Sequence, residues 1–268
     1  SGFAVVLAIY MWTMLDREVN RFSKYAGTFA FGWRIILTTG TGSIFGFLVA
    51  REAYATAILA PLFIVMSLLY GTAVYYLILK IISKFHNTYI SDDIVKNLRK
   101  LTIMFLFANL YFLFLYHITN MYIAKHLDYE IFILSSGGIY TIAFWVGQLF
   151  VGIIIPIILM NSSRLSLEYS LILSSVLILI GSFIAMYVII IGGQAYPLTI
   201  FPDHVIIESS FYDNVVHSYI PSVYELGLGL GGVALALIIV LIGIANFKFL
   251  PTIIKPANVI PNKDDAAD

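Results

Sequence analysis

The chain of 268 residues is 60% hydrophobic and 11% charged, carries no formal net charge, and has a mean hydropathy of +0.94. Soluble domains carry roughly 25% charged residues, so this composition excludes a soluble enzyme, a nucleic-acid-binding protein and a disordered chain. The absence of cysteine excludes disulfides, Cys-ligated zinc and a Cys-ligated iron–sulfur cluster in this chain. The sequence therefore predicts an all-α fold, a polytopic transmembrane helical bundle.

Seven segments are candidate membrane spans, since a transmembrane helix needs about 20 predominantly apolar residues. The first two cover residues 2–15 and 25–40, and the second carries Arg34 in its interior. The other five contain no Asp, Glu, Lys or Arg: residues 53–79, 101–124, 131–163, 169–202 and 226–247. We expect about seven spans in a transmembrane domain of residues 1–250, followed by a cytoplasmic tail at residues 251–268. The start at Ser1, without Met or a signal sequence, predicts a chain that is processed or incomplete at its N-terminus.

The basic residues predict the orientation, because Lys and Arg concentrate in cytoplasmic loops. With Arg17, Arg21 and Lys24 inside, the alternation of spans places 12 of the 15 basic residues on the cytoplasmic side. The loop between the sixth and seventh spans is then extracytoplasmic and acidic, with Asp203, Glu208 and Asp213. The sequence thus predicts a multi-pass protein of the cytoplasmic membrane whose first residue is extracytoplasmic.

Polar side chains inside spans are candidate site residues, because they are costly in hydrocarbon unless they face the bundle interior or a wet cavity. On the fourth span, Asn109, Tyr116, His117 and Asn120 fall within one sector of the helix at about 100° per residue. This stripe opens toward the extracytoplasmic side and predicts a binding site. The alternative is that Asn and His join neighbouring helices by hydrogen bonds.

Other polar residues form a second group of candidates. Thr141 and Gln148 share a face of the fifth span, where packing is the alternative, and Gln194 lies near the outer boundary. Glu225 follows Pro221 at the start of the seventh span, where the helix dipole favours a carboxylate. Arg34 either extends to one surface, pairs with a buried acid or attracts an anion.

Histidine placement argues against haem. A transmembrane b-type haem needs a facing His pair, whereas of the five histidines only His117 lies within a predicted span. We therefore expect neither haem nor a metal ion in this chain.

Several motifs together resemble the NrfD/PsrC (polysulfide reductase-like) family of integral membrane subunits. They are IGGQAYPLTIFP (residues 191–202), YIPSVYE (219–225), GTGSIFGFLVAREAY (40–54) and APLFIVMSLLYGTA (60–73). Their order and spacing are most similar to the HybB/DsrP-like branch. Members of that branch usually have about ten spans, so the resemblance implies that two or three N-terminal helices are missing before Ser1. The chain departs from the family at Met186, where Arg is frequent, and at His117 and Gln148, where acidic residues are common.

This resemblance implies a quinone- or quinol-binding membrane subunit of a respiratory oxidoreductase complex without a catalytic centre of its own. It would use menaquinone or ubiquinone and exchange electrons with an extracytoplasmic, ferredoxin-like iron–sulfur subunit, beside other membrane and cytochrome subunits. His117, Asn120, Tyr116 and Asn109 are the expected head-group contacts, with Gln148, Thr141, Gln194 and Glu225 second. Arg34 and Glu225 are candidates for a proton path or ion pair.

The sequence leaves more than one function open, both in the metabolic pathway and in the class of protein. The DsrP-like motif at residues 40–54 favours sulfur-compound metabolism, and a HybB-like hydrogenase subunit is the alternative. A secondary transporter is an alternative of another class, because residues 39–46 are interrupted by Gly and Arg34 lies within the membrane.

Overall fold

The computed structural model describes residues 2–16, 18–85, 90–162, 164–197, 216 and 219–246. All regular structure in these ranges is helical, which confirms the all-α class. The predicted tail at residues 251–268 and the acidic loop with Asp203, Glu208 and Asp213 lie outside the described residues.

The chain forms long helices because every backbone N–H and C=O in hydrocarbon must be satisfied within its own segment. The α-helices of the described residues are α1 (Gly2–Leu15), α2 (Ser23–Gly46), α3 (Leu59–Phe85), α4 (Asp92–Tyr122), α5 (Leu127–Ile131), α6 (Ile139–Ile142), α7 (Ile155–Asn161), α8 (Leu167–Met186), α9 (Gly193–Ala195) and α10 (Val223–Asn246). Two 3₁₀ turns, η1 (Asn20–Phe22) and η2 (Ala124–His126), and three π-helical segments, η3 (Phe132–Ser136), η4 (Ala143–Ile154) and η5 (Tyr187–Gly192), connect or extend them.

Five helical runs in the described ranges are long and apolar enough to cross a membrane. They are Leu59–Lys84, Asp92–Tyr122, Ile139–Asn161, Leu167–Ala195 and Val223–Gly243, and they match the five uncharged segments of the sequence. The other two predicted spans are also helical, as α1 with 14 residues and α2 with 24. That α1 and α2 cross the membrane stays a prediction.

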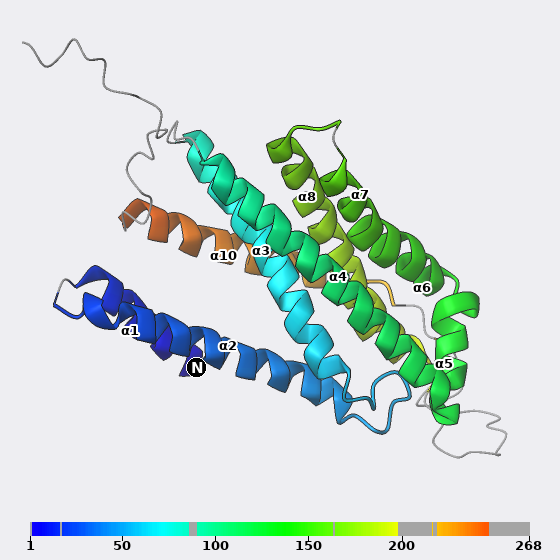
Figure 1. Ribbon diagram of the computed structural model, residues 1–268. Helices are drawn as coiled ribbons and strands as arrows, with labels where there is room; N and C mark the ends of the chain where they lie inside the picture. The colour runs from blue at the N-terminus through cyan, green and yellow to red at the C-terminus, as the bar shows by residue number, and fades with distance from the viewer. Residues whose placement is uncertain are drawn as a thin grey trace, which may run out of the picture.

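The helices form a central bundle with a hairpin at one end (Figure 1). α3 packs against α2, α4 and α8, while α8 also packs against η4 and α7. α1 and α2 run antiparallel, and the end of α2 meets the start of α3 (Figure 1). Within the described part of the chain, no side chain of the apolar run Val223–Gly243 is buried.

Small residues allow the closest helix contact. A Cβ built at Gly181 of α8 would lie 2.2 Å from the Gly152 Cα of η4. Small residues let backbones approach in membranes, where dispersion replaces the hydrophobic effect as the main attraction between helices. These two glycines therefore set the distance between α8 and the continuous helical run formed by α6, η4 and α7.

The π-helical segment η4 ends at the turn that contains Pro156, the second residue of α7. Proline has no N–H, so it cannot continue the i→i−4 ladder of the preceding turn. A π-helical segment changes which side chains share a face, and such segments are frequent at functional sites. Phe144 and Gln148 are buried, whereas Trp145 is 41% exposed.

Candidate functional site

One face of α4 is buried along its whole length. Its members recur every three or four residues: Thr102, Leu106, Asn109, Leu113, Tyr116, His117 and Asn120. The predicted stripe therefore faces the protein interior, and its polar members lie where unpaired groups would cost free energy. α4 begins with Asp92 and Asp93 in its first turn, where the helix dipole favours carboxylates.

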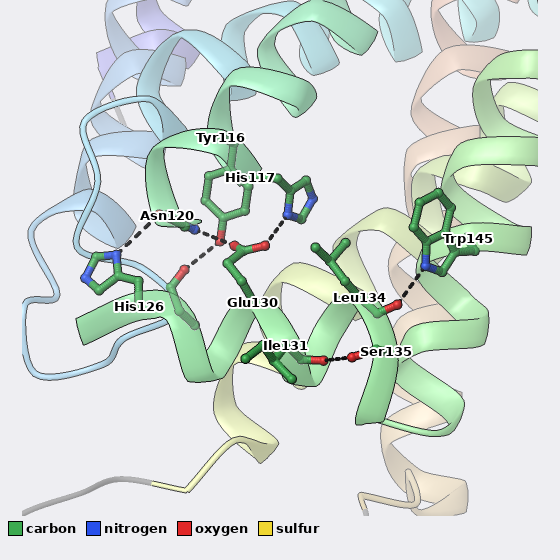
Figure 2. Close-up of polar contacts among 10 residues, drawn as sticks. Tyr116, His117, Asn120, His126, Glu130, Ile131, Leu134, Ser135 and Trp145 are labelled. Carbon is green, nitrogen blue, oxygen red and sulfur yellow. Dashed lines mark hydrogen bonds and ion pairs between the residues drawn. The ribbon is translucent and has the colours of Figure 1, made fainter. Parts of the chain in front are cut away.

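Glu130 of α5 supplies the partner for this face. Its side chain is buried, and its Oε2 lies 2.7 Å from His117 Nδ1 (Figure 2). Asn120 Nδ2 donates to Glu130 Oε1 at 2.8 Å, so both carboxylate oxygens accept from α4. A carboxylate beside Nδ1 fixes the ring orientation and leaves Nε2 as the nitrogen that can exchange a proton with a ligand.

His126 extends this cluster toward the helix end. Its Nδ1 lies 3.3 Å from Asn120 Oδ1 (Figure 2), and the ring is buried. Burial lowers the pKa of His126, and the positive charge of Lys125 lowers it further. A neutral His126 that donates from Nδ1 to the amide oxygen would orient the Asn120 amide nitrogen toward Glu130.

Two tyrosines close the other side of the cluster. The Tyr116 hydroxyl donates to the Ala53 carbonyl at 2.7 Å, which ties α4 to the loop before α3. Tyr129 is buried beside Tyr116, and burial raises its pKa well above 10. Tyr129 therefore remains a protonated phenol over the physiological pH range.

A small cavity lies against His117. Its volume is about 10 Å³, roughly the space of one water molecule. Its polar lining residues are Tyr116, His117, Tyr129 and Gln148, and its apolar lining residues are Leu62, Leu113, Ile133, Phe144, Val188 and Ile189.

Two side chains of η4 face His117 or its cavity. The His117 ring meets the Phe144 ring edge to face, with centroids 4.7 Å apart. Gln148 Oε1 is buried and has no hydrogen-bond partner among the described residues. An acceptor in this state favours a ligand that carries a donor.

The structure brings only part of the predicted site together. His117, Tyr116 and Gln148 line the cavity. Asn120 does not line it and is linked to His117 through Glu130. Asn109 is buried on the same face of α4 as His117 but lies about 12 Å along the helix from it.

The remaining candidates have local roles. Thr141 accepts from Gly137 N at 3.0 Å and donates to the Phe132 carbonyl at 3.1 Å, which stabilises the turn between η3 and α6. The Gln194 side chain is exposed, and the main-chain carbonyl of Gln194 accepts from Arg51 at 2.8 Å.

Glu225 and Arg34 also lie outside the lining of the cavity. The exposed Glu225 accepts from Ser222 N at 2.7 Å and from Ser222 Oγ at 2.9 Å, as a helix cap does. Arg34 is exposed on α2, with its guanidinium 5.6 Å from the centre of the Phe3 ring.

Glu130, Tyr129 and Phe144 are the site residues that the sequence analysis missed. Glu130 and Tyr129 directly precede the third uncharged segment, residues 131–163, and carry no periodic signal of their own. The available signal was a carboxylate adjacent to a span, which is costly at that depth unless it is paired. Phe144 lies one α-helical turn before Gln148, but an apolar side chain gives no signal within an apolar span.

Comparison with known proteins agrees with the membrane architecture. Residues 1–197 match the family model described as "Polysulphide reductase, NrfD". A similar protein is the "Hdr-like menaquinol oxidoreductase integral membrane subunit" of Archaeoglobus fulgidus, which is 24% identical over 258 residues. The matched region covers 94% of this chain and 64% of that relative's length. No solved structure matches the chain.

Proposed function

Because the chain belongs to the NrfD polysulphide reductase family of membrane proteins, we propose that it is the quinol-reactive membrane subunit of an oxidoreductase complex. The observation that carries this proposal is the buried His117–Glu130 pair beside the unpartnered Gln148 acceptor. The relative named as a menaquinol oxidoreductase subunit supports menaquinol rather than ubiquinol as the substrate.

His117 is the base in the proposed reaction. Menaquinol becomes menaquinone by losing two electrons and two protons. One hydroxyl proton passes to His117 Nε2, and the Glu130 carboxylate at Nδ1 stabilises the resulting imidazolium. The second hydroxyl proton, which the Gln148 amide oxygen can bind but not take up, is released to water.

The polar and apolar groups of the cavity lining match those of a quinol, although the cavity is smaller than the quinol ring. Gln148 Oε1 is an acceptor for the second hydroxyl, and the apolar lining matches the faces of the ring. At about 10 Å³ the cavity holds only a water-sized group, so quinol entry requires displacement of lining side chains.

The electrons would leave to a partner subunit. The chain has no cysteine, and no cluster of potential metal ligands occurs in the part of it that the structure describes. We propose a ferredoxin-like iron–sulfur acceptor on the extracytoplasmic side, the side assigned to the His117 end of α4 by the distribution of basic residues. Sulfur-compound metabolism stays the favoured pathway class, with a hydrogenase complex as the alternative.

Two of the three glycines that motivate the transporter alternative, Gly42 and Gly46, lie in close helix contacts, whereas a Cβ built at Gly40 would meet no atom within 4 Å. A Cβ built at Gly42 would lie 2.7 Å from the Ala60 Cα, and one built at Gly46 would lie 2.8 Å from the Thr56 carbonyl oxygen. Close packing against the start of α3 therefore accounts for Gly42 and Gly46.

Replacement of His117 tests the proposed function. In the purified complex, His117→Ala should lower kcat for menaquinol oxidation by about 10²- to 10⁴-fold, the usual contribution of a general base. Thr102→Val is the matched control, because Thr102 is buried on the same face of α4 but bonds only locally to the Leu98 carbonyl. Unchanged activity in His117→Ala would remove His117 from the reaction.

A further inference from the structure

A second cavity lies at the other end of α4. It has a volume of about 280 Å³ and is lined by Arg99, Asn161, Ser162, Leu165, Leu167 and Ser170. These residues come from the first third of α4, the end of α7, the start of α8 and the connection between α7 and α8. Arg99 is 18 residues before His117 on α4, about 27 Å along the axis. The cavity is therefore separate from the proposed quinol site.

Arg99 is the cationic residue of this cavity lining, and no acidic side chain among the described residues forms an ion pair with it. Its Nε is buried without a hydrogen-bond partner in the described part of the chain. Nearby lysines differ: Lys80 pairs with Glu168, and Lys96 lies 3.9 Å from Asp93. A partly buried guanidinium without a counter-charge is costly, so an anion from outside the chain would stabilise it.

The remaining lining supplies further donors. Asn161 Nδ2 gives one hydrogen to the Ile157 carbonyl at 3.0 Å and retains a second. Ser162 contributes a hydroxyl whose oxygen accepts from Arg164 N at 3.3 Å. Leu167 begins α8, whose positive dipole end also favours an anion.

We propose that this cavity binds the phosphate group of an anionic membrane lipid. A guanidinium matches two phosphate oxygens in a bidentate arrangement, and basic pockets between transmembrane helices on the cytoplasmic side bind such head groups. The basic-residue distribution assigns this end of α4 to the cytoplasmic side. Leu165 and Leu167 border the polar lining with apolar surface, as a lipid requires at the boundary between head group and acyl chain. The bound lipid would join α4 to the connection between α7 and α8.

Lipid titration of the full chain in neutral detergent tests this proposal. Phosphatidylglycerol should raise Tm by about 5 °C when it is well above its Kd, whereas phosphatidylcholine should not. Arg99→Gln should abolish the shift. Lys100→Gln is the matched control, because Lys100 is the exposed neighbour of Arg99 and the change in charge is the same. Arg99→Lys keeps the charge but loses the bidentate geometry, so it should retain part of the shift and serves if Arg99→Gln does not fold.

Two results would overturn the lipid assignment. An equal phosphatidylglycerol shift in Arg99→Gln and Lys100→Gln would show that Arg99 is not the ligand. An equal Tm rise with inorganic phosphate at the same concentration would show that the cavity takes free phosphate rather than a lipid. Native mass spectrometry that retains phosphatidylglycerol on the wild type and loses it on Arg99→Gln would support the proposal.

Discussion

Glu130 Oε2 lies 2.7 Å from His117 Nδ1, although the two residues lie on different helices joined by a tight turn. Asn120 donates to the other carboxylate oxygen, which holds the carboxylate in the position from which it orients the imidazole. The pair is the local basis of the proposed reaction.

Removal of the Glu130 charge should impair turnover more than substrate binding. Glu130→Gln keeps the shape but loses the carboxylate that stabilises the His117 imidazolium, so we expect kcat for menaquinol oxidation to fall about 10- to 100-fold. The KM for menaquinol should change little. Steady-state kinetics of the complex measures both, and Glu130→Asp, which keeps the charge, should recover part of kcat. A rise in KM alone would assign Glu130 to binding instead.

Replacement of Gln148 should have opposite effects on stability and binding. Gln148→Leu removes a buried acceptor without a partner among the described residues, so the free energy of unfolding should rise by about 1 kcal/mol. If the acceptor binds a quinol hydroxyl, the KM for menaquinol should rise about tenfold. Thermal unfolding and kinetics on the same preparation check the two effects. A more stable variant with normal KM would exclude Gln148 from the quinol site.

The contact between Gly152 and Gly181 should not tolerate a side chain. Gly181→Leu would place atoms in the Gly152 backbone, so we expect a loss of about 1–3 kcal/mol in the free energy of unfolding. Gly71→Leu is the control, because a Cβ built at Gly71 meets no atom within 4 Å. Thermal unfolding in detergent should separate the two variants. Equal Tm values would contradict the close approach of η4 and α8.

Protonation of His126 should destabilise the protein at acidic pH. Burial lowers the pKa of His126 in the folded state, whereas a histidine in the unfolded chain has a pKa of about 6.5. Below that pH the unfolded state binds the proton first, so stability should fall as the pH falls, and above it this effect should vanish. Lys125 reinforces the shift, and the negative charge of Glu130 opposes it. Tm measured from pH 5 to pH 8 should slope less in His126→Gln, and identical slopes would contradict this assignment.

The sequence by itself determined the membrane class, the five apolar spans and the buried face of α4. These features follow from composition and from a period of 3.6 residues, which are local properties of the chain. The stripe with Asn109, Tyr116, His117 and Asn120 could therefore be predicted before any helix was placed.

Only the tertiary structure decided which residues complete the site. Glu130 reaches His117 because the turn through η2 folds α5 back onto α4, and no periodicity encodes that path. Phe144 meets the His117 ring edge to face, a contact between two different helical segments that no helical period encodes. Asn109, in contrast, shares the face of His117 but not its cavity, because position along the helix axis matters as much as direction around it.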